Sequence, residues 1–371
     1  MSLLKNQYIW ENIKKNMETS KYTIKTKRIK ESKINEVDWD NIPFGRVFSD
    51  HMLVMDYKDG KWGEPEIIPF GDMAIHPATS AIHYGQSVFE GMKGYRTVSG
   101  EPVVFRPEMN AQRFRKSAER MCMADISEEL FMFCLEELLK FDDEWIPKKQ
   151  TNSLYIRPFM FATDGYTGIK PSETYRFMIF TCPVGSYYTE AINVKIEEKY
   201  SRAAEGGVGA AKAAGNYAAS LYPAKIEQDR GFHQLIWTDA KTHEYIEEAG
   251  TMNVLFVIEG KLITPAESDT ILAGISKRSV IELAQDWGMP VEERKVSVKE
   301  VIQALEDGTM TEAFGAGTAA TIAPIKMIGF RGKEYFLPGE EKRTFSKKVL
   351  SELDDIKYGR MVDRFNWVKK F

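Results

Sequence analysis

The chain has 371 residues, of which 43% are hydrophobic and 28% charged, and its formal net charge at pH 7 is −4. This length exceeds what one hydrophobic core usually serves and predicts two domains. The slightly acidic balance excludes a general attraction to nucleic acid, and no apolar run is long enough for a membrane-spanning helix. Three cysteines without a CxxC pair and five histidines without ligand spacing predict no metal site and a reducing compartment.

The first half of the chain begins with a polar arm over residues 1–40 and continues with strand patterns. Residues 52–57 and 66–70 flank an Asp-Gly turn and predict a hairpin. Two helices follow, one opened by Pro107 and ending near residue 121, the other capped by Ser127 and ending at residue 141. Further strands are predicted at residues 103–105, 154–157 and 177–182.

Strands and helices also mix in the second half of the chain. Strands are predicted at residues 234–238, 254–258 and 262–264, and helices at 276–287, 298–306 and 341–353. Because there is no regular βαβ alternation, we expect α+β domains with mixed sheets. The predicted division is a small N-terminal domain (1–181), a linker (182–192) and a larger C-terminal domain (193–371).

The most unusual segment is residues 205–220, EGGVGAAKAAGNYAAS, which is almost all glycine and alanine around Lys212. Composition alone favours a flexible linker or a helix of small residues, because lysines usually lie on the surface. The alternative is a lysine on a closely packed backbone. Partial burial there lowers the pKa of an amine, so that the amine can attack a carbonyl compound and form a Schiff base.

Two adjacent acids, Glu247 and Glu248, precede the apolar strand predicted at residues 254–258. Paired acids beside glycine and asparagine are most often a solvated turn. The alternative is that one carboxylate points inward at a cationic partner. Such a partner could be the protonated ring nitrogen of an electron-accepting cofactor.

Two glycine-containing segments are candidates for anion binding. Residues 315–320, GAGTAA, free backbone N–H groups and match the pattern GxGxxA, but Pro324 and the strand-like run 322–328 argue against the helix that a dinucleotide fingerprint requires. Residues 272–276 lead into a predicted helix, either as an ordinary cap or as a phosphate-binding helix N-terminus.

Arginines add further candidate anion ligands. Arg113 lies in the predicted helix that Pro107 opens, and Arg157 lies in a predicted strand. Tyr155 and Arg157 are two residues apart in that strand, so their side chains point to the same face. Taken singly, an arginine more often lies on the surface than in a site.

Together these segments resemble the branched-chain aminotransferases, pyridoxal-phosphate enzymes of fold type IV that are related to D-amino-acid aminotransferase and aminodeoxychorismate lyase. The motifs occur in the order typical of the family and cover nearly everything from Phe44 to the C-terminus. They are FGRVFSDHM (44–52), HPATSAIHYGQSVFEGMK (76–93), FRPEMNAQRF (105–114), SLYIRP (153–158), CPVGSYY (182–188), AAKAAGNYAAS (210–220), EEAGTMNVLFV (247–257), TILAGISKRS (270–279) and FGAGTAA (314–320).

The resemblance implies pyridoxal phosphate as cofactor, bound as a Schiff base to Lys212, which also transfers the proton during catalysis. It places Glu248 at the pyridine nitrogen and Tyr217 at the ring hydroxyl. The implied phosphate ligands are Arg113, Ile275, Ser276 and Thr318. The implied substrate-binding residues are Tyr84, Arg157 and the N–H of Ala319 for carboxylates, Phe44, Phe89, Tyr155 and Tyr187 for side chains, and Thr251.

The implied reaction is reversible transfer of the amino group of L-leucine, L-isoleucine or L-valine to 2-oxoglutarate, in a cytoplasmic homodimer. Burial of each aliphatic side chain contributes roughly 1.5–3 kcal/mol, while tyrosine hydroxyls and Arg157 can meet the glutamate carboxylate. Ala320 and Ala323 stand where mammalian members carry a CxxC pair, which excludes a thiol switch there. The alternatives are a D-amino-acid aminotransferase or lyase of the same fold, an NAD-dependent dehydrogenase built on residues 315–320, and a non-catalytic binding protein.

Overall fold

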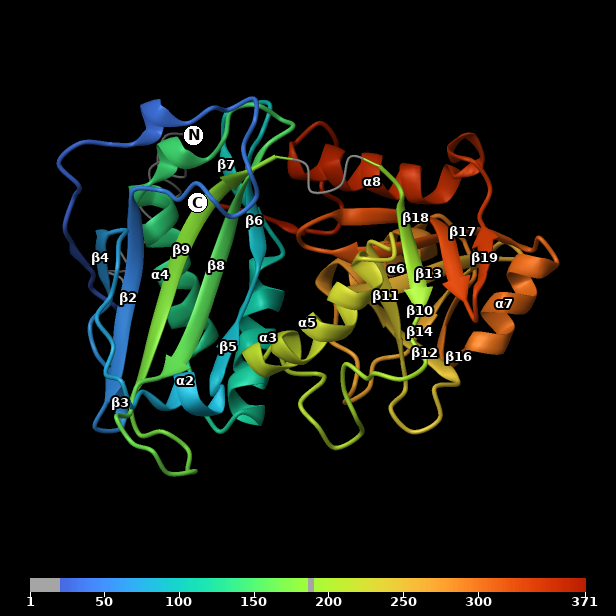
Figure 1. The fold of residues 1–371 in the computed structure, drawn as a ribbon. Coiled ribbons are helices and arrows are strands. Elements are labelled where there is room, and N and C mark those ends of the chain that lie inside the picture. The colour runs from blue at the N-terminus through green and yellow to red at the C-terminus, as the bar shows by residue number, and fades with distance from the viewer. Residues whose placement is uncertain (1–20, 186–189) are drawn as a thin grey trace, which may run out of the picture.

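A computed structural model describes residues 21–185 and 190–371 (Figure 1). These residues form two bodies that lie side by side, each built on one ten-stranded sheet. Both sheets contain parallel and antiparallel pairs, for example parallel β1 and β4 in the first and parallel β10 and β11 in the second. The prediction of an α+β fold with mixed sheets is therefore confirmed.

The first sheet has the order β1-β4-β2-β9-β8-β6-β7-β20, with β3 beside β2 and β5 beside β8. Its strands are β1 (Lys25–Thr26), β2 (His51–Lys58), β3 (Lys61–Trp62), β4 (Glu66–Pro69), β5 (Ser87–Phe89), β6 (Met92–Arg96), β7 (Pro102–Phe105), β8 (Ser153–Ala162), β9 (Tyr175–Val184) and β20 (Val368–Lys370). The predicted hairpin is confirmed, since β2 turns into β3 at Asp59 and Gly60, both with positive φ, and pairs with β4.

The helices and short 3-10 turns of the first body are α2 (Ser80–Tyr84), α3 (Pro107–Arg120), α4 (Glu128–Phe141), η1 (Ile34–Glu36) and η2 (Asp143–Trp145). Helices α3 and α4 begin as predicted, because proline suits a first turn and the Ser127 hydroxyl accepts a hydrogen bond from the Leu130 N–H at 3.1 Å. Phe114 and Phe131 from these helices pack on Phe177 of the sheet, with ring centroids 5.5 to 5.7 Å apart. This core fixes α3, and with it Arg113, against the sheet.

The second sheet has the order β15-β14-β13-β17-β18-β10-β11-β12-β16, with β19 beside β18. Because β12 also pairs with β13, the strands from β13 through β17, β18, β10 and β11 to β12 close into a ring. The strands are β10 (Ile192–Ile196), β11 (Gln234–Thr238), β12 (Tyr245–Ala249), β13 (Met252–Ile258), β14 (Lys261–Pro265), β15 (Val291–Arg294), β16 (Val296–Ser297), β17 (Met310–Gly317), β18 (Thr321–Phe330) and β19 (Lys333–Phe336). The helices are α5 (Ala214–Gln228), α6 (Ile275–Asp286), α7 (Val298–Glu306), η3 (Glu340–Lys342) and α8 (Thr344–Lys357).

The structure decides two alternatives that the sequence left open in the second half and corrects one predicted boundary. The adjacent acids 247 and 248 do not form a solvated turn but lie buried in strand β12. The last helix begins at Thr344 rather than residue 341, because the N–H groups of Phe345 and Ser346 bond to the buried Glu312 carboxylate. Residues 315–320 lead from β17 into antiparallel β18 and not into a helix, as Pro324 indicated.

The chain connects the two bodies twice. Strand β9 ends at Val184 and β10 begins at Ile192, and at the end of the chain β20 returns to pair with β7 of the first sheet (Figure 1). The division into domains at 181 and 193 stays a prediction. Among the described residues, no helix combines the length and apolar character needed to cross a membrane, and no group of three acids, histidines or cysteines is placed to hold a metal ion.

Candidate active site

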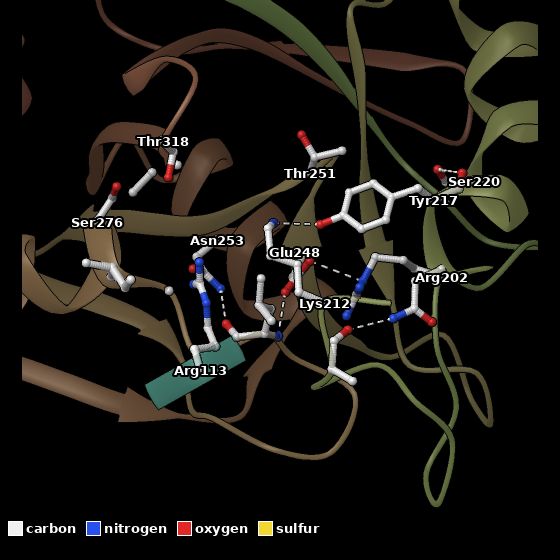
Figure 2. Close-up of a pocket in the computed structure, with 18 residues that line it drawn as sticks. Arg113, Arg202, Lys212, Tyr217, Ser220, Glu248, Thr251, Asn253, Ser276 and Thr318 are labelled. Carbon is white, nitrogen blue, oxygen red and sulfur yellow. Dashed lines mark hydrogen bonds and ion pairs between the residues drawn. The ribbon is translucent and has the colours of Figure 1, made fainter. Parts of the chain in front are cut away.

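Two adjoining cavities lie where the bodies meet. The first is drawn in Figure 2 and is lined by Arg113 of α3 together with residues of the second body. The second, of about 600 Å³, is lined on one side by aromatic residues of the first sheet and on the other by residues of the second body. Lys212, Tyr217, Thr251 and Thr318 line both cavities, so that a molecule bound in one can meet a molecule bound in the other.

Lys212 is held by its backbone between the two bodies. Its N–H donates to the Ser117 hydroxyl at 2.9 Å, and its carbonyl accepts from the Phe89 N–H at 3.1 Å. The neighbouring Ala211 and Ala213 are buried, and their small side chains permit this close approach. The amine lies 2.9 Å from the hydroxyl of Tyr217, which comes from the first turn of α5 (Figure 2). Of the two interpretations of segment 205–220, the lysine on a packed backbone is the one that the geometry supports.

Glu248 lies at the base of the same cavity and is buried. Its Oε1 accepts a hydrogen bond from the Leu272 N–H at 2.7 Å, and its Oε2 lies 3.1 Å from Nε of Arg202. Burial raises the pKa of Glu248 above its usual value, while Arg202 and the Leu272 N–H act in the opposite direction. The cavity therefore joins an amine, Lys212, to a carboxylate that a buried arginine helps keep ionised.

The other side of the cavity collects anion-binding groups. Helix α6 begins at Ile275 without a side-chain cap, so the N–H groups of Ile275 and Ser276 lie at its positive end. Arg113 donates to the Ala273 carbonyl at 2.8 Å, just before this helix. Thr318 lies in the turn between β17 and β18, and Figure 2 shows it with Ser276 and Arg113 on one side of the lysine.

Glu90, which sequence reasoning missed, fixes the orientation of Arg113. The Glu90 carboxylate is fully buried and accepts from Nε and Nη2 of Arg113 at 2.7 and 2.8 Å and from the Asn110 amide at 2.6 Å. Burial alone would raise the pKa of Glu90, but Arg113 outweighs it and holds the pKa below its usual value. An acid inside the strand-like run SVFEGMK was the available signal.

The larger cavity gathers most of the predicted substrate-binding residues. Arg157 donates to the Tyr155 hydroxyl at 2.8 Å and lies 4.7 Å from the centre of the Phe89 ring, which confirms that the strand pair shares a face. The Phe44 ring packs edge-on against Tyr155 at 5.3 Å. Thr251, Ala319, Phe159 and Phe180 complete the apolar wall around these groups.

One predicted residue does not line either cavity, and another lies outside the described residues. Tyr84 is 43% exposed on α2, donates to the Thr167 carbonyl at 2.5 Å and lines neither cavity. Tyr187 lies outside the described residues. Conversely, Arg202 and Asn253 line the first cavity although no local pattern marked them, because their partners Glu248 and Leu272 are distant in sequence.

The donor set fits pyridoxal phosphate. One cavity contains a group for each part of the cofactor. The amine suits its aldehyde, the buried carboxylate suits its ring nitrogen, and the helix N-terminus with an arginine and a threonine suits its phosphate. The N–H groups at the start of α6 have no helical partner and no capping side chain, which leaves them for an anion.

The fold and cavity are those of an aminotransferase, and the family model of class IV aminotransferases matches residues 87–328. The chain belongs to this family. It is 43% identical over 335 residues to branched-chain-amino-acid transaminase 1 of Bacillus subtilis, covering 89% of this chain and 94% of that one. It is 37% identical over 339 residues to the branched-chain-amino-acid aminotransferase of Mycolicibacterium smegmatis, covering 89% and 92%. The resemblance drawn from the motifs is thereby confirmed.

Solved structures agree. The branched-chain aminotransferase of Escherichia coli superimposes with a TM-score of 0.71 at 28% identity, covering 86% of this chain and 98% of that one. The enzyme of Thermobaculum terrenum in its pyridoxal-phosphate form has the same fold, with a TM-score of 0.68 at 24% identity and coverage of 86% and 98%. The predictions of an aminotransferase fold and of pyridoxal phosphate as cofactor are confirmed.

Proposed function

We propose that this chain transfers the amino group of L-leucine, L-isoleucine or L-valine reversibly to 2-oxoglutarate. The observation that carries the proposal is the shared lining of the two cavities by Lys212, Tyr217 and Thr318. This joins a polar site that contains an amine and a buried carboxylate to an aromatic one that also contains an arginine, Arg157. The names of the curated relatives support the same substrates.

The residues of the first cavity have separate roles in this proposal. Pyridoxal phosphate, when bound, supplies an electron-accepting ring. Lys212 provides the amine that attaches to its aldehyde and moves a proton during the reaction. Tyr217, whose hydroxyl lies 2.9 Å from that amine, hydrogen-bonds the ring hydroxyl. Glu248 holds the ring nitrogen protonated. Arg113, Ile275, Ser276 and Thr318 bind the phosphate.

The second cavity selects the substrate. Phe44, Phe89 and Tyr155 offer apolar surface to an aliphatic side chain, whose burial contributes roughly 1.5–3 kcal/mol. Arg157 is already bonded to the Tyr155 hydroxyl, so it can receive the side-chain carboxylate of glutamate without exposing a bare charge to leucine. The N–H of Ala319 and the hydroxyl of Thr251 bind the substrate's own carboxylate.

The test is transamination of L-leucine with 2-oxoglutarate, followed by glutamate formation and by the visible absorbance of the protein. We expect turnover by the wild type and a loss of at least about a thousandfold in Lys212→Ala. Lys195→Met is the matched control, because Lys195 pairs with Glu227 at 2.9 Å and lines neither cavity. Turnover of D-alanine without L-leucine would instead establish the D-amino-acid aminotransferase alternative.

We further propose two domains that meet at the cavities and a cytoplasmic homodimer. Six large apolar side chains are exposed on α2 and the adjoining loops, namely Met73, Ile75, Ile82, Tyr84, Tyr166 and Ile169. The Thr79–Gly165 bridge and the Tyr84–Thr167 hydrogen bond make these loops one surface. A second copy packed on it would cover the apolar side chains and is the route by which Tyr84 can meet substrate. Sedimentation of the wild type and of Ile82→Glu tests this, with a monomer expected only for the variant.

A further inference from the structure

A third, small cavity lies directly behind the phosphate-binding side of the site and shares Ile275, Ser276 and Thr318 with it. Two lysines line it, Lys93 from β6 of the first sheet and Lys357 from α8. Lys357 is buried and Lys93 is partly buried, and burial of an ammonium group is costly unless it finds a partner. Neither residue belongs to the roles described above.

Lys93 contacts the turn that carries two of the proposed ligands. Its Nζ donates to the Ala319 carbonyl at 2.7 Å, across the junction between the two sheets. Next to it, the Thr318 hydroxyl donates to the Gly91 carbonyl at 3.0 Å. The β5–β6 segment of the first sheet therefore holds the β17–β18 turn at both a proposed phosphate ligand and a proposed substrate ligand.

The turn adopts a conformation that its own sequence does not favour. Thr321, at its end, has φ of 64°, which is uncommon for a β-branched residue. Such a backbone persists only where surrounding contacts determine it. Lys357 supplies one such contact, with its Nζ 3.4 Å from the Thr321 hydroxyl, and Lys93 supplies another at Ala319.

We propose that Lys93 is a positioning residue: by holding the Ala319 carbonyl it restricts rotation of the backbone at Ala319 and so keeps the Ala319 N–H directed toward the substrate carboxylate, and its charge strengthens carboxylate binding. The inference rests on the proposed function, because it assigns the substrate carboxylate to that turn. A charged donor bonds a carbonyl more strongly than a neutral one, so the ionisation of Lys93 sets how firmly the turn is held.

The surroundings place that ionisation in the working range of pH. Burial lowers the pKa of Lys93 to about 7, Lys357 acts in the same direction, and Asp354 of α8 opposes them. Tyr95 of β6 also lines the cavity, and burial raises the pKa of its hydroxyl well above the usual value, so it stays neutral. Lys93 is therefore charged below about pH 7 and neutral above it.

The first test measures kcat and KM for L-leucine from pH 6 to pH 9 in the wild type, Lys93→Met, Lys93→Arg and the control Lys195→Met. We expect Lys93→Met to raise KM about tenfold at pH 6 and by less than about threefold at pH 9, with a smaller change in kcat, since the lost contact serves binding. The KM of the wild type should rise with pH as Lys93 loses its charge above about pH 7. Lys93→Arg, which is charged throughout, should have a KM within about threefold of wild type at pH 6 and should not show this rise.

The second test does not depend on activity. Amide hydrogen exchange in the peptide spanning residues 317–322, at pH 6, should be about tenfold faster in Lys93→Met than in the wild type or Lys195→Met. A KM ratio of Lys93→Met to wild type that is the same at pH 6 and pH 9, or an unchanged exchange rate, overturns the inference. If the wild type does not transaminate L-leucine, the proposed function is refuted instead. The amide hydrogen exchange of residues 317–322 then decides whether Lys93 holds the turn. If Lys93→Met does not fold, a pH-dependent KM in Lys93→Arg overturns it.

Discussion

The buried pair of Glu90 and Arg113 gives a quantitative prediction. The substitution Glu90→Gln keeps the shape of the side chain and one acceptor oxygen but removes the charge opposite a guanidinium that is only 10% exposed. Removing one partner of a buried pair costs about 3–5 kcal/mol, and a single charge-assisted hydrogen bond contributes about 1.5–3 kcal/mol. Because glutamine retains part of the contact, we expect the free energy of unfolding at pH 7 to fall by about 2–4 kcal/mol.

The first sheet contains a matched control. Arg176 donates to Asp56 from Nε and Nη2 at 2.7 and 2.8 Å, the same distances as in the buried pair, but Asp56 is 59% exposed. Exposed pairs contribute about 0.2–1 kcal/mol, so Asp56→Asn should cost no more than that. Urea unfolding of the cofactor-free proteins, followed by tryptophan fluorescence, measures both variants. Equal losses in the two would refute the reasoning, because the pairs share their geometry and differ in burial and in the bond that Glu90 accepts from Asn110.

The stability difference between wild type and Glu90→Gln should also depend on pH. Arg113 holds the pKa of Glu90 below its usual value against the effect of burial. A carboxylate with a lowered pKa adds stability that is fully present above the pKa of the unfolded chain, about 4.3, and is lost as the pH falls through the folded value. The difference in stability between wild type and Glu90→Gln should therefore be full at pH 7 and shrink below about pH 4. A difference that persists in acid would show that the charge is not its cause.

Two further predictions concern the first cavity. An added Cβ at Gly274 would lie 1.7 Å from Oδ1 of the buried Asn253, beside the α6 N-terminus. Gly274→Ala should therefore weaken pyridoxal-phosphate binding at least tenfold, measured by equilibrium dialysis, and weaken pyridoxal binding less. Equal losses for the two compounds would argue against a phosphate site there. Arg202→Leu removes the cation beside Glu248, whose pKa burial already raises, so the acid limb of the kcat profile should move to higher pH, and an unmoved limb would contradict the assigned role of Arg202.

The site residues that could be predicted from the sequence lie in short segments whose local pattern is itself unusual. Lys212 is the one lysine in a run of glycine and alanine, and Tyr155 and Arg157 share a strand face by their spacing alone. Arg202 and Glu90 carry no such signal, because each acts on a partner that only the tertiary fold brings near. A buried ion pair between distant segments is a property of packing and cannot be derived from local spacing.

The same distinction separates predicted from missed elements. Helices α4 and α7 were predictable because Ser127 and Ser297 cap them through hydrogen bonds to N–H groups three residues later. Strand β12 was missed because a strand covered on both faces can bury adjacent acids, provided that each finds a partner, as Glu247 does at the Thr270 hydroxyl, 2.6 Å away. The polar residues of β12 are therefore a sign of a functional site and not of an exposed segment.

Neither body contains a complete site. The first supplies Arg113 and the aromatic wall, and the second supplies Lys212 and the start of α6. The two are joined by the bond that the Gly91 carbonyl accepts from Thr318 and by the bond that Lys93 donates to Ala319. A ligand that binds only the joined form stabilises it by RT ln(1 + [L]/Kd). Cofactor binding and the packing of the two bodies are therefore linked, and a substitution at their junction must change both together. This linkage explains why charged groups that contact neither cofactor nor substrate in the proposal, such as the buried Glu90 and the partly buried Lys93, lie at the junction.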